Sequence, residues 1–370
     1  MVTTRAEQVV AAAAAAFGRP LADPVVLADA DWTLVLRCTD ASSGERVVVK
    51  GYPATAAGAC CFAAEAAGLE LAGDSGLTPR SLAVAPAALT VVMSDLGTGP
   101  SLADLLLGDS AEAAEAALLA WAAGCGQLSA RNHGRRAEFE AILAGHLAGQ
   151  QEERHIAGLP DRVLGVPEQA AGLGVDAPAG LTSELAAVAD AVASGGPEVF
   201  SPGDICPDNN VLTSDGIRFL DFEEAGFHSV FLDAAYIRMP FATCWCVFRL
   251  PGPLADAAEM AYRGQVSGTW PALADDGAWQ AGVRLAVAAW SLSATSWLLR
   301  RSLRGNVPMH PDRPSPRTRT LMRFRWQSLA AELEQSGELP ATAALMRRLL
   351  TATDGWQAAD LPVYPAFRPR

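Results

Sequence analysis

The stretch FSPGDICPDNNVLTSDGIRFLDFE, residues 200–223, is the densest cluster of polar side chains in the chain. Two short apolar runs within it are joined by Asp215-Gly216, a dipeptide typical of two-residue β-hairpin turns. Such a hairpin places Asp204 and Asn209 just before its first strand and Asp221 at the end of its second strand. We therefore expect these three polar side chains to meet at one edge of the hairpin.

The residue types in this cluster suit the transfer of a phosphoryl group to a hydroxyl. One carboxylate, Asp204, can orient the attacking hydroxyl and accept its proton. An amide and a second carboxylate, from Asn209 and Asp221, can hold Mg²⁺ on the nucleotide phosphates. The alternative is a solvated loop followed by a turn, with no catalytic role.

Lys50 is the only lysine in a chain with 28 lysine and arginine residues. It ends the strand-like run of residues 45–50. Arginine serves most solvated charges, but its planar fork cannot replace a compact ammonium group on a flexible stem. Lys50 therefore marks a position where an ammonium group is required, and chance survival of one lysine is the alternative.

In their order along the chain, these motifs resemble the aminoglycoside phosphotransferase and choline kinase family. The family pattern is His-Gly-Asp, four residues, Asn, and later Asp-Phe-Glu; here the matching residues are Gly203-Asp204, Asn209 and residues 221–223. The resemblance extends over about residues 20–240. It implies an α+β, protein-kinase-like two-lobe fold, with a small β-rich N-lobe in residues 1–95 and a larger, mostly helical C-lobe in residues 96–370.

The resemblance also implies a role for each matching position in an ATP- and Mg²⁺-dependent phosphotransferase. It implies that Asp204 is the catalytic base, and that Asn209 and Asp221 are the magnesium ligands. Lys50 would touch the α and β phosphates and pair with Glu65. The remaining positions that it implies are a hinge that binds adenine through its backbone, at Met93, Ser94, Asp95 and Leu96, and a structural carboxylate that braces the catalytic loop, at Asp233.

Two positions depart from the family pattern. Pro202 stands where the family has the histidine, so a bracing side chain and a backbone donor are both lost. The segment expected to cover the phosphates, residues 28–32, has no glycine and carries two carboxylates. These departures favour an alternative in which the chain is a nucleotide-binding pseudokinase scaffold.

The acceptor of the phosphoryl group is open. A net charge of −13 argues against nucleic acid as a partner and favours a cationic small molecule with a hydroxyl, such as an aminoglycoside or an amino-sugar. The alternative is a Ser/Thr hydroxyl of a peptide, or another biosynthetic intermediate, engaged by an arginine-rich segment. Its arginines are Arg300, Arg301, Arg304, Arg313, Arg317, Arg319, Arg323 and Arg325.

The other residues give weaker signals. Seven cysteines show no paired CxxC spacing, so neither a disulfide framework nor a zinc site is indicated. The five histidines, His228 among them, show no ligand or triad spacing and are expected at the surface or in the core. No run reaches the roughly 18 apolar residues that a membrane span needs, and we expect a cytoplasmic protein with no membrane partner.

The pattern of apolar and polar residues along the chain predicts the helices and strands only coarsely. Residues 147–180, rich in Gly, Pro and Gln, look like an insertion or a mobile loop. We expect strands at residues 32–38, 46–50, 82–84 and 89–93, and helices at residues 56–73, 101–107, 111–130 and from Asp233 to about Leu350, apart from residues 306–319.

Overall fold

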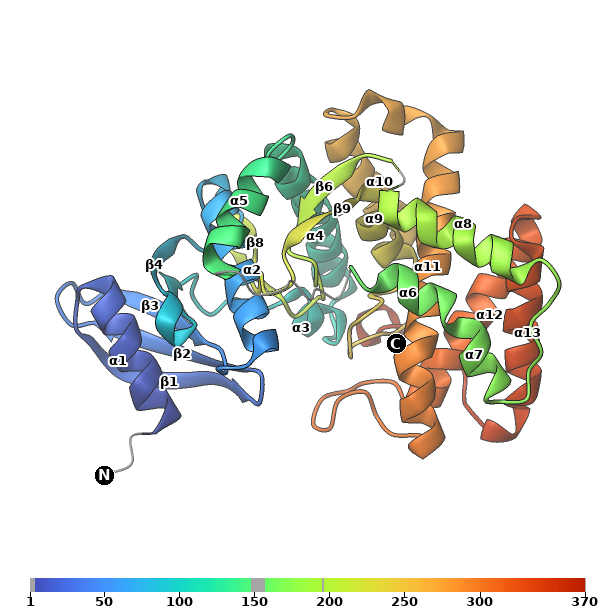
Figure 1. Ribbon diagram of the computed structural model, residues 1–370, viewed down its shortest axis with the longest axis horizontal. Helices are drawn as coiled ribbons and strands as arrows, with labels where there is room; N and C mark the ends of the chain where they lie inside the picture. Colours follow the sequence, from blue (N-terminus) through green and yellow to red (C-terminus); the bar gives the residue numbers. More distant parts are fainter. Residues whose placement is uncertain (1–3, 148–156, 195, 370) are drawn as a thin grey trace.

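A five-stranded antiparallel sheet forms the core of the smaller lobe (Figure 1). The computed structural model describes residues 4–147, 157–194 and 196–369. The strand order is β1-β2-β3-β5-β4. The strands are β1 (Leu21–Ala30), β2 (Thr33–Asp40), β3 (Arg46–Gly51), β4 (Ser81–Ala85) and β5 (Thr90–Ser94).

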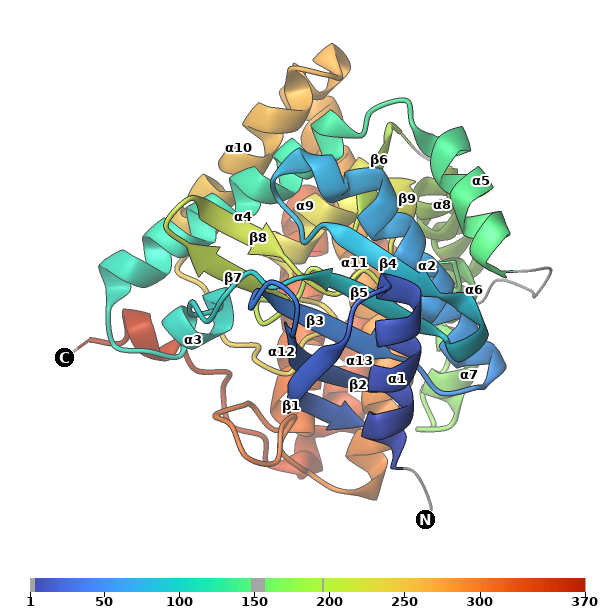
Figure 2. The ribbon, with the colours of Figure 1, turned by 90° about the vertical axis from the view of Figure 1, so that its left-hand side faces the viewer.

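Helices α1 (Arg5–Phe17) and α2 (Ala56–Ala72) cover the two faces of this sheet, and Figure 2 shows α1 lying across one of them. Side chains alternate along a strand, so Val47 and Val49 of β3 pack with Val9 in the α1-side core. Lys50 must then point to the opposite face, toward α2. The Ala-rich run near the start of the chain is thus a helix that packs on the sheet.

Helix α2 is buried between the sheet and the C-lobe. Contrary to the expectation from the sequence, one helix among the described residues, Ala56–Ser75, is long and apolar enough to cross a membrane. In the structure 72% of its most apolar window is buried inside the protein. Gly68 lets this helix lie directly against the C-lobe, because a Cβ atom there would be 2.9 Å from Ala225 Cβ and from Phe222 Cδ1. The closeness of α2 to residue 222 sets the geometry of the site described below.

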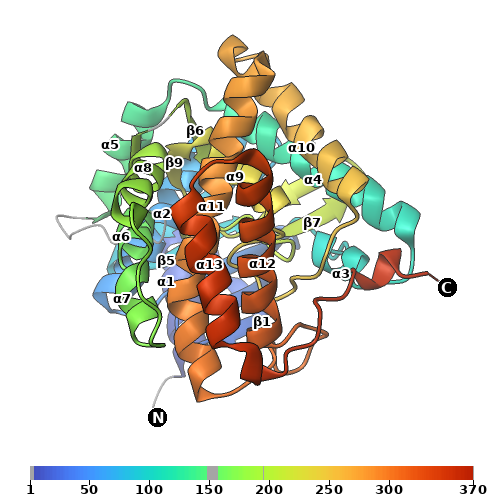
Figure 3. The same cartoon turned by 90° about the vertical axis from the view of Figure 1, so that its right-hand side faces the viewer.

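The larger lobe is mostly helical, and Figure 3 shows three of its long helices, α11, α12 and α13, side by side. Two small antiparallel sheets, β6 with β9 and β7 with β8, lie between the N-lobe and these helices. The elements are α3 (Leu102–Leu106), α4 (Ala111–Arg131), α5 (Arg136–Leu147), α6 (Leu159–Leu164), α7 (Val166–Ala171), α8 (Leu181–Ser194), β6 (Glu198–Ser201), β7 (Asn210–Thr213), β8 (Gly216–Phe219), β9 (Gly226–Ser229), α9 (Val230–Arg238), α10 (Gly252–Ser267), α11 (Asp276–Arg304), α12 (Thr318–Ser336) and α13 (Pro340–Ala352).

Two sequence expectations need correction. The expectation of a loop at residues 147–180 is wrong where the short helices α6 and α7 form, and residues 148–156 lie outside the described part. Strand β1 has no counterpart among the strands expected from the sequence, and Pro24 lies within it. Pro24 fits because β1 is an edge strand and a register shift between Ala22 and Val25 accommodates it.

We expect Gly68→Ala to lower the free energy of unfolding by roughly 1–3 kcal/mol, because the added methyl overpacks the contact with Phe222 and Ala225. Gly145→Ala is the matched control, since this helical glycine in α5 has nothing within 4 Å of a built Cβ. The control should be neutral or stabilising by up to about 1 kcal/mol. Urea denaturation of both variants checks the pair, and equal effects would contradict the packing described here.

Candidate active site

One carboxylate oxygen, Oε2 of Glu65, joins the two lobes. It accepts hydrogen bonds from Lys50 Nζ at 2.9 Å, Tyr52 OH at 3.1 Å and the backbone N of Phe222 at 2.8 Å. The structure thus pairs Lys50 with Glu65, as the resemblance implied. Glu65 lies in the middle of α2. The helix therefore holds this carboxylate against Lys50 of β3 and against the segment that follows β8.

Lys50 also contacts two carboxylates of the C-lobe. Its Nζ forms an ion pair with Asp221 and lies 3.2 Å from Glu223 Oε2. Burial disfavours the charged ammonium, but these carboxylates and Glu65 outweigh it and hold the pKa of Lys50 well above its usual value. Lys50 is therefore a fixed positive charge at the boundary between the lobes.

The loop before β7, residues 202–209, carries Asp204 and Asn209, and we call it the catalytic loop after the role that the resemblance implies. Its turn requires glycine. Gly203 has φ +88°, and a Cβ there would be 2.1 Å from the carbonyl oxygen of Glu224. The Asn209 amide nitrogen donates to the backbone carbonyl of Asp204 at 3.0 Å. Its amide oxygen is then the group that can face a cation. Asn210, which is buried, donates to the carbonyl of Pro207 at 2.9 Å and ties the end of the loop.

Asp221 follows β8 in an unusual backbone conformation. Its φ is +65°, a left-handed conformation that a non-glycine residue adopts at a cost and that occurs often at functional sites. Oδ1 of Asp221 contacts Lys50. Asp221 and Asn209 carry a carboxylate and an amide oxygen, which are ligand types that a hard divalent cation takes.

The site holds more negative charge than Lys50 can neutralise. Burial, with the nearby Asp221 and Asp208 carboxylates, raises the pKa of Asp204 to about 6. Burial and the same Asp221 raise the pKa of Glu223 to about 7, against the effect of Lys50. Carboxylates that raise one another's pKa are stabilised when a cation binds between them, so the residues present fit a divalent metal ion.

Asp204 is held by residues that sequence reasoning did not select. Its Oδ1 accepts from Thr243 Oγ1 at 2.9 Å and from Tyr236 OH at 3.2 Å. Both lie in the segment after β9 that the sequence marks only as helical. Their hydroxyls carry no spacing signal, so only the fold identifies them.

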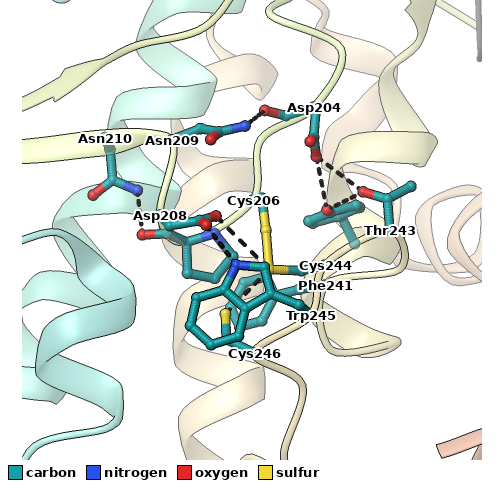
Figure 4. The surroundings of a disulfide bond; sticks show 12 residues. Asp204, Cys206, Asp208, Asn209, Asn210, Phe241, Thr243, Cys244, Trp245 and Cys246 are labelled. Carbon is teal, nitrogen blue, oxygen red and sulfur yellow. Dashed lines mark hydrogen bonds between the residues drawn. A yellow bond between two sulfur atoms is a disulfide. The ribbon is translucent and has the colours of Figure 1, made fainter. Parts of the chain in front are cut away.

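The structure contains a disulfide beside the catalytic loop, which corrects the expectation from cysteine spacing. Cys206 is bonded to Cys244, 38 residues away, and Cys246 Sγ lies 3.1 Å from Cys244 Sγ (Figure 4). Connectivity between distant cysteines cannot be read from sequence, because the fold brings them together. The three sulfurs lie within 4.8 Å of one another, but two of them are used in the bond.

Asp233 lies behind the catalytic loop and has a histidine partner that sequence reasoning placed only in the surface or core. His228, buried on β9, donates from Nε2 to Asp233 Oδ1 at 2.8 Å. The same oxygen accepts from Ser201 Oγ at 3.3 Å, and Ser201 Oγ accepts from Gly203 N at 3.2 Å. These contacts connect Asp233 to the loop although Pro202 replaces the histidine of the family pattern.

The predicted hinge residues Met93, Ser94, Asp95 and Leu96 lie at and beyond the end of β5. Ser94 pairs with Val47, three residues along β3 from Lys50, or about 10 Å at the usual rise of a strand. The Asp95 side chain is bound by Arg37, with Nε 2.8 Å from Oδ2. The Asp95 carboxylate is thus already paired with arginines of the N-lobe sheet.

Residues 28–32 form the end of β1 and the turn into β2. The turn lies at Asp31 and Trp32, and the Trp32 ring is 63% exposed. A glycine-free hairpin therefore stands where the phosphate-covering segment was expected.

No protein-family model matches the chain, and no curated protein matches it. Its structure is similar to that of choline kinase from Cryptosporidium parvum, with a TM-score of 0.53 and 13% identity over 87% of this chain and 93% of that one. It is also similar to an ethanolamine kinase from Plasmodium vivax, with a TM-score of 0.50 and 12% identity over 88% and 83%. At these identities the likeness concerns the fold: the chain has the protein-kinase-like two-lobe fold that its motifs predict.

We expect Asp204→Asn to stabilise the metal-free protein at pH 8 by roughly 1–3 kcal/mol. The pKa of Asp204 is raised from 3.8 to about 6, so folding favours the protonated form, and the cost of the carboxylate grows as pH rises through this window. Asn keeps the oxygen that Thr243 and Tyr236 contact but carries no charge.

The stabilisation should disappear below about pH 3, under the unfolded-state pKa of 3.8, where the wild-type carboxyl is protonated in both states. Urea denaturation with a chelator at about pH 8 and at about pH 3 measures both values. Asp215→Asn, in the exposed hairpin turn, is the control and should change stability little at either pH. A destabilised Asp204→Asn protein at pH 8 would contradict the assigned charge state.

Proposed function

We propose that the chain is a phosphotransferase that moves the γ-phosphoryl group of ATP to a hydroxyl of a small molecule, with Mg²⁺. The observation that carries this proposal is the meeting of Lys50 and Glu65 from one lobe with Asp221 from the other, beside Asp204 and Asn209. Each of these groups is one that phosphoryl transfer uses. The protein-kinase-like fold supports the same reading.

In this proposal each lobe has its own role. The N-lobe, residues 1–95, binds the nucleotide: Lys50 contacts the α and β phosphates, and Glu65 holds Lys50 in place. The backbone of residues 93–96 would bind adenine, as the resemblance implies, while the Asp95 side chain stays paired with Arg37. The C-lobe, residues 96–370, supplies the catalytic loop, the metal ligands and the acceptor site.

Asn209 and Asp221 would hold Mg²⁺, which neutralises charge on the transferring phosphates when bound. Asp204 accepts the proton of the acceptor hydroxyl as its oxygen bonds to phosphorus, and the bond from the γ-phosphorus to the leaving ADP oxygen breaks. Since the pKa of Asp204 is about 6, the carboxyl is ionised and able to accept a proton at neutral pH.

A cationic acceptor, such as an aminoglycoside or an amino-sugar, fits the charge of the site. Asp204 and Asp208 add carboxylates that form no ion pair with Lys50, and Glu223 shares Lys50 with Asp221 and Glu65. The whole chain carries a net charge of −13. Carboxylates stabilise ammonium groups and raise the rate of encounter with them.

The arginine-rich segment gives little support to a peptide acceptor, because most of its arginines already have partners within the C-lobe. Arg301 donates to the carbonyl of Pro308 at 3.0 Å, and Arg319 to that of Ser302 at 3.1 Å. Arg323 donates to Thr353 and Leu350, and Arg313 pairs with Asp104 at 2.6 Å. These contacts stabilise the ends of α11 and α12 and leave few free guanidinium groups.

The pseudokinase alternative rests on Pro202 and the glycine-free turn at residues 28–32. Pro202 is weak support for a pseudokinase, because Ser201, His228 and Asp233 hold the loop from another side. Turnover decides between the two functions.

A screen for acceptor-dependent ADP release, over cationic antibiotics, amino-sugars, choline-like amines and Ser/Thr peptides, should find a small-molecule acceptor. Asp204→Asn should then bind Mg-ATP but lose turnover by roughly two to four orders of magnitude, as removal of a general base does. Asp221→Asn should instead weaken Mg-dependent nucleotide binding. Turnover with peptides alone would show that the acceptor is a peptide hydroxyl and not a small molecule. Nucleotide binding without any turnover would favour the pseudokinase.

Lys50→Arg should lower kcat/KM for ATP by roughly 10- to 100-fold although the charge is kept. The larger planar fork cannot fit the buried position between Glu65 and Asp221. Arg19→Lys, a half-exposed exchange remote from the site, should leave kcat/KM unchanged. Wild-type kinetics in Lys50→Arg would remove the argument from the single lysine.

A further inference from the structure

The segment Phe241–Cys246, which we call the brace, lies along the catalytic loop and contacts every second residue of it (Figure 4). Thr243 Oγ1 donates to Asp204 Oδ1 at 2.9 Å. Cys244 is bonded to Cys206. Trp245 Nε1 donates to Asp208 Oδ2 at 2.6 Å. Three consecutive brace residues therefore hold three alternate loop residues, one of them covalently.

The brace is itself anchored in the core. Phe241 is fully buried, and its ring meets that of Trp121 edge-on at 5.5 Å between centroids and that of Tyr236 at 5.9 Å. Its φ of +51° turns the chain back toward the loop directly after α9. Thr243 thus contacts Asp204 from a segment whose first residue is packed in the core.

The hydrogen bonds distinguish the two oxygens of Asp204. Both Thr243 and Tyr236 lie against Oδ1, and their own oxygens are 2.6 Å apart, so two hydroxyl protons serve three contacts. In every arrangement of these protons Oδ1 accepts at least one. Within the described residues no hydrogen bond to Oδ2 is present, which leaves Oδ2 to take a proton from an acceptor.

We propose that Thr243 is a positioning residue that fixes Oδ1 of Asp204 and leaves Oδ2 as the proton acceptor, and that the Cys206–Cys244 disulfide holds the brace in register. The inference deepens the proposed function and rests on it for its catalytic part. Catalysis then depends on thiol oxidation state: a dithiol reductant supplies two electrons and two protons, the S–S bond breaks to two thiols, and the reductant becomes a disulfide.

The first test removes the Thr243 hydroxyl. Thr243→Val keeps the shape, and Thr243→Ser keeps the hydroxyl. Loss of a hydrogen bond to a carboxylate should lower kcat by roughly 10- to 100-fold, with KM for ATP changed less than about twofold. Thr243→Ser should restore most of kcat. Wild-type kcat in the Val variant, or a Ser variant as slow as Val, overturns the positioning role.

The second test needs no turnover. Hydrogen exchange in peptides covering residues 202–209 should rise when the wild-type protein is reduced with dithiothreitol, and in Thr243→Val. The double variant Cys206→Ser/Cys244→Ser should match reduced wild type and ignore the reductant. Cys38→Ala, a free cysteine of the N-lobe sheet, should respond as wild type does.

The two tests separate the two claims. Unchanged exchange in residues 202–209 on reduction and in Thr243→Val overturns the brace, whatever the protein catalyses. A loop that loosens on reduction, in a protein that never turns over any acceptor even when oxidised, supports the brace and overturns the proposed kinase activity instead. A loosened loop with a matching fall in kcat supports both.

Discussion

The buried ion pair between Lys50 and Glu65 is the constraint on which the rest of the site depends. A charged lysine can be buried only where carboxylates surround it, and here they come from both lobes. Glu65 also accepts the backbone N–H of Phe222, so one oxygen fixes β3, α2 and the segment after β8 relative to one another. Removal of Lys50 would leave Glu65, Asp221 and Glu223 without the cation that pairs with all three.

The catalytic loop is held from three sides, which explains how it tolerates Pro202. Behind it, Asp233 receives hydrogen bonds from Ser201 and His228. At its end, Asn210 ties it to α3 through the backbone N of Leu102 at 2.9 Å. Along its length runs the brace. The function of one lost side chain is thus spread over contacts from separate elements.

The sequence predicts the parts of the site whose spacing is local. The predicted hairpin forms with its turn one residue earlier than expected, at Ser214 and Asp215, because Gly216 pairs with Thr213, and Asp221 follows its second strand. The single lysine is conspicuous in the sequence on its own. The helix at residues 56–73 is apolar except for its two glutamates, and the family pattern selects Glu65. The roles given to these residues stay predictions, since the fold alone does not test them.

The remaining features depend on contacts that no local pattern records. Cys206 and Cys244 meet only because the chain after α9 turns back at Phe241. His228 is a lone histidine in sequence, and its carboxylate partner becomes visible only when β9 and α9 are placed. β1 contains Pro24, which an edge strand accepts, and an edge position is known only from the sheet order.

The central claim is that the charges around Lys50 form a metal-dependent nucleotide site. A thermal-shift titration of the wild-type protein with ATP, with Mg²⁺ and with a chelator, tests it most directly. The account predicts a saturable rise in Tm with ATP and Mg²⁺ together and a much smaller rise with ATP alone, because the carboxylates repel a bare triphosphate. No rise in either condition would contradict the claim and leave only the fold.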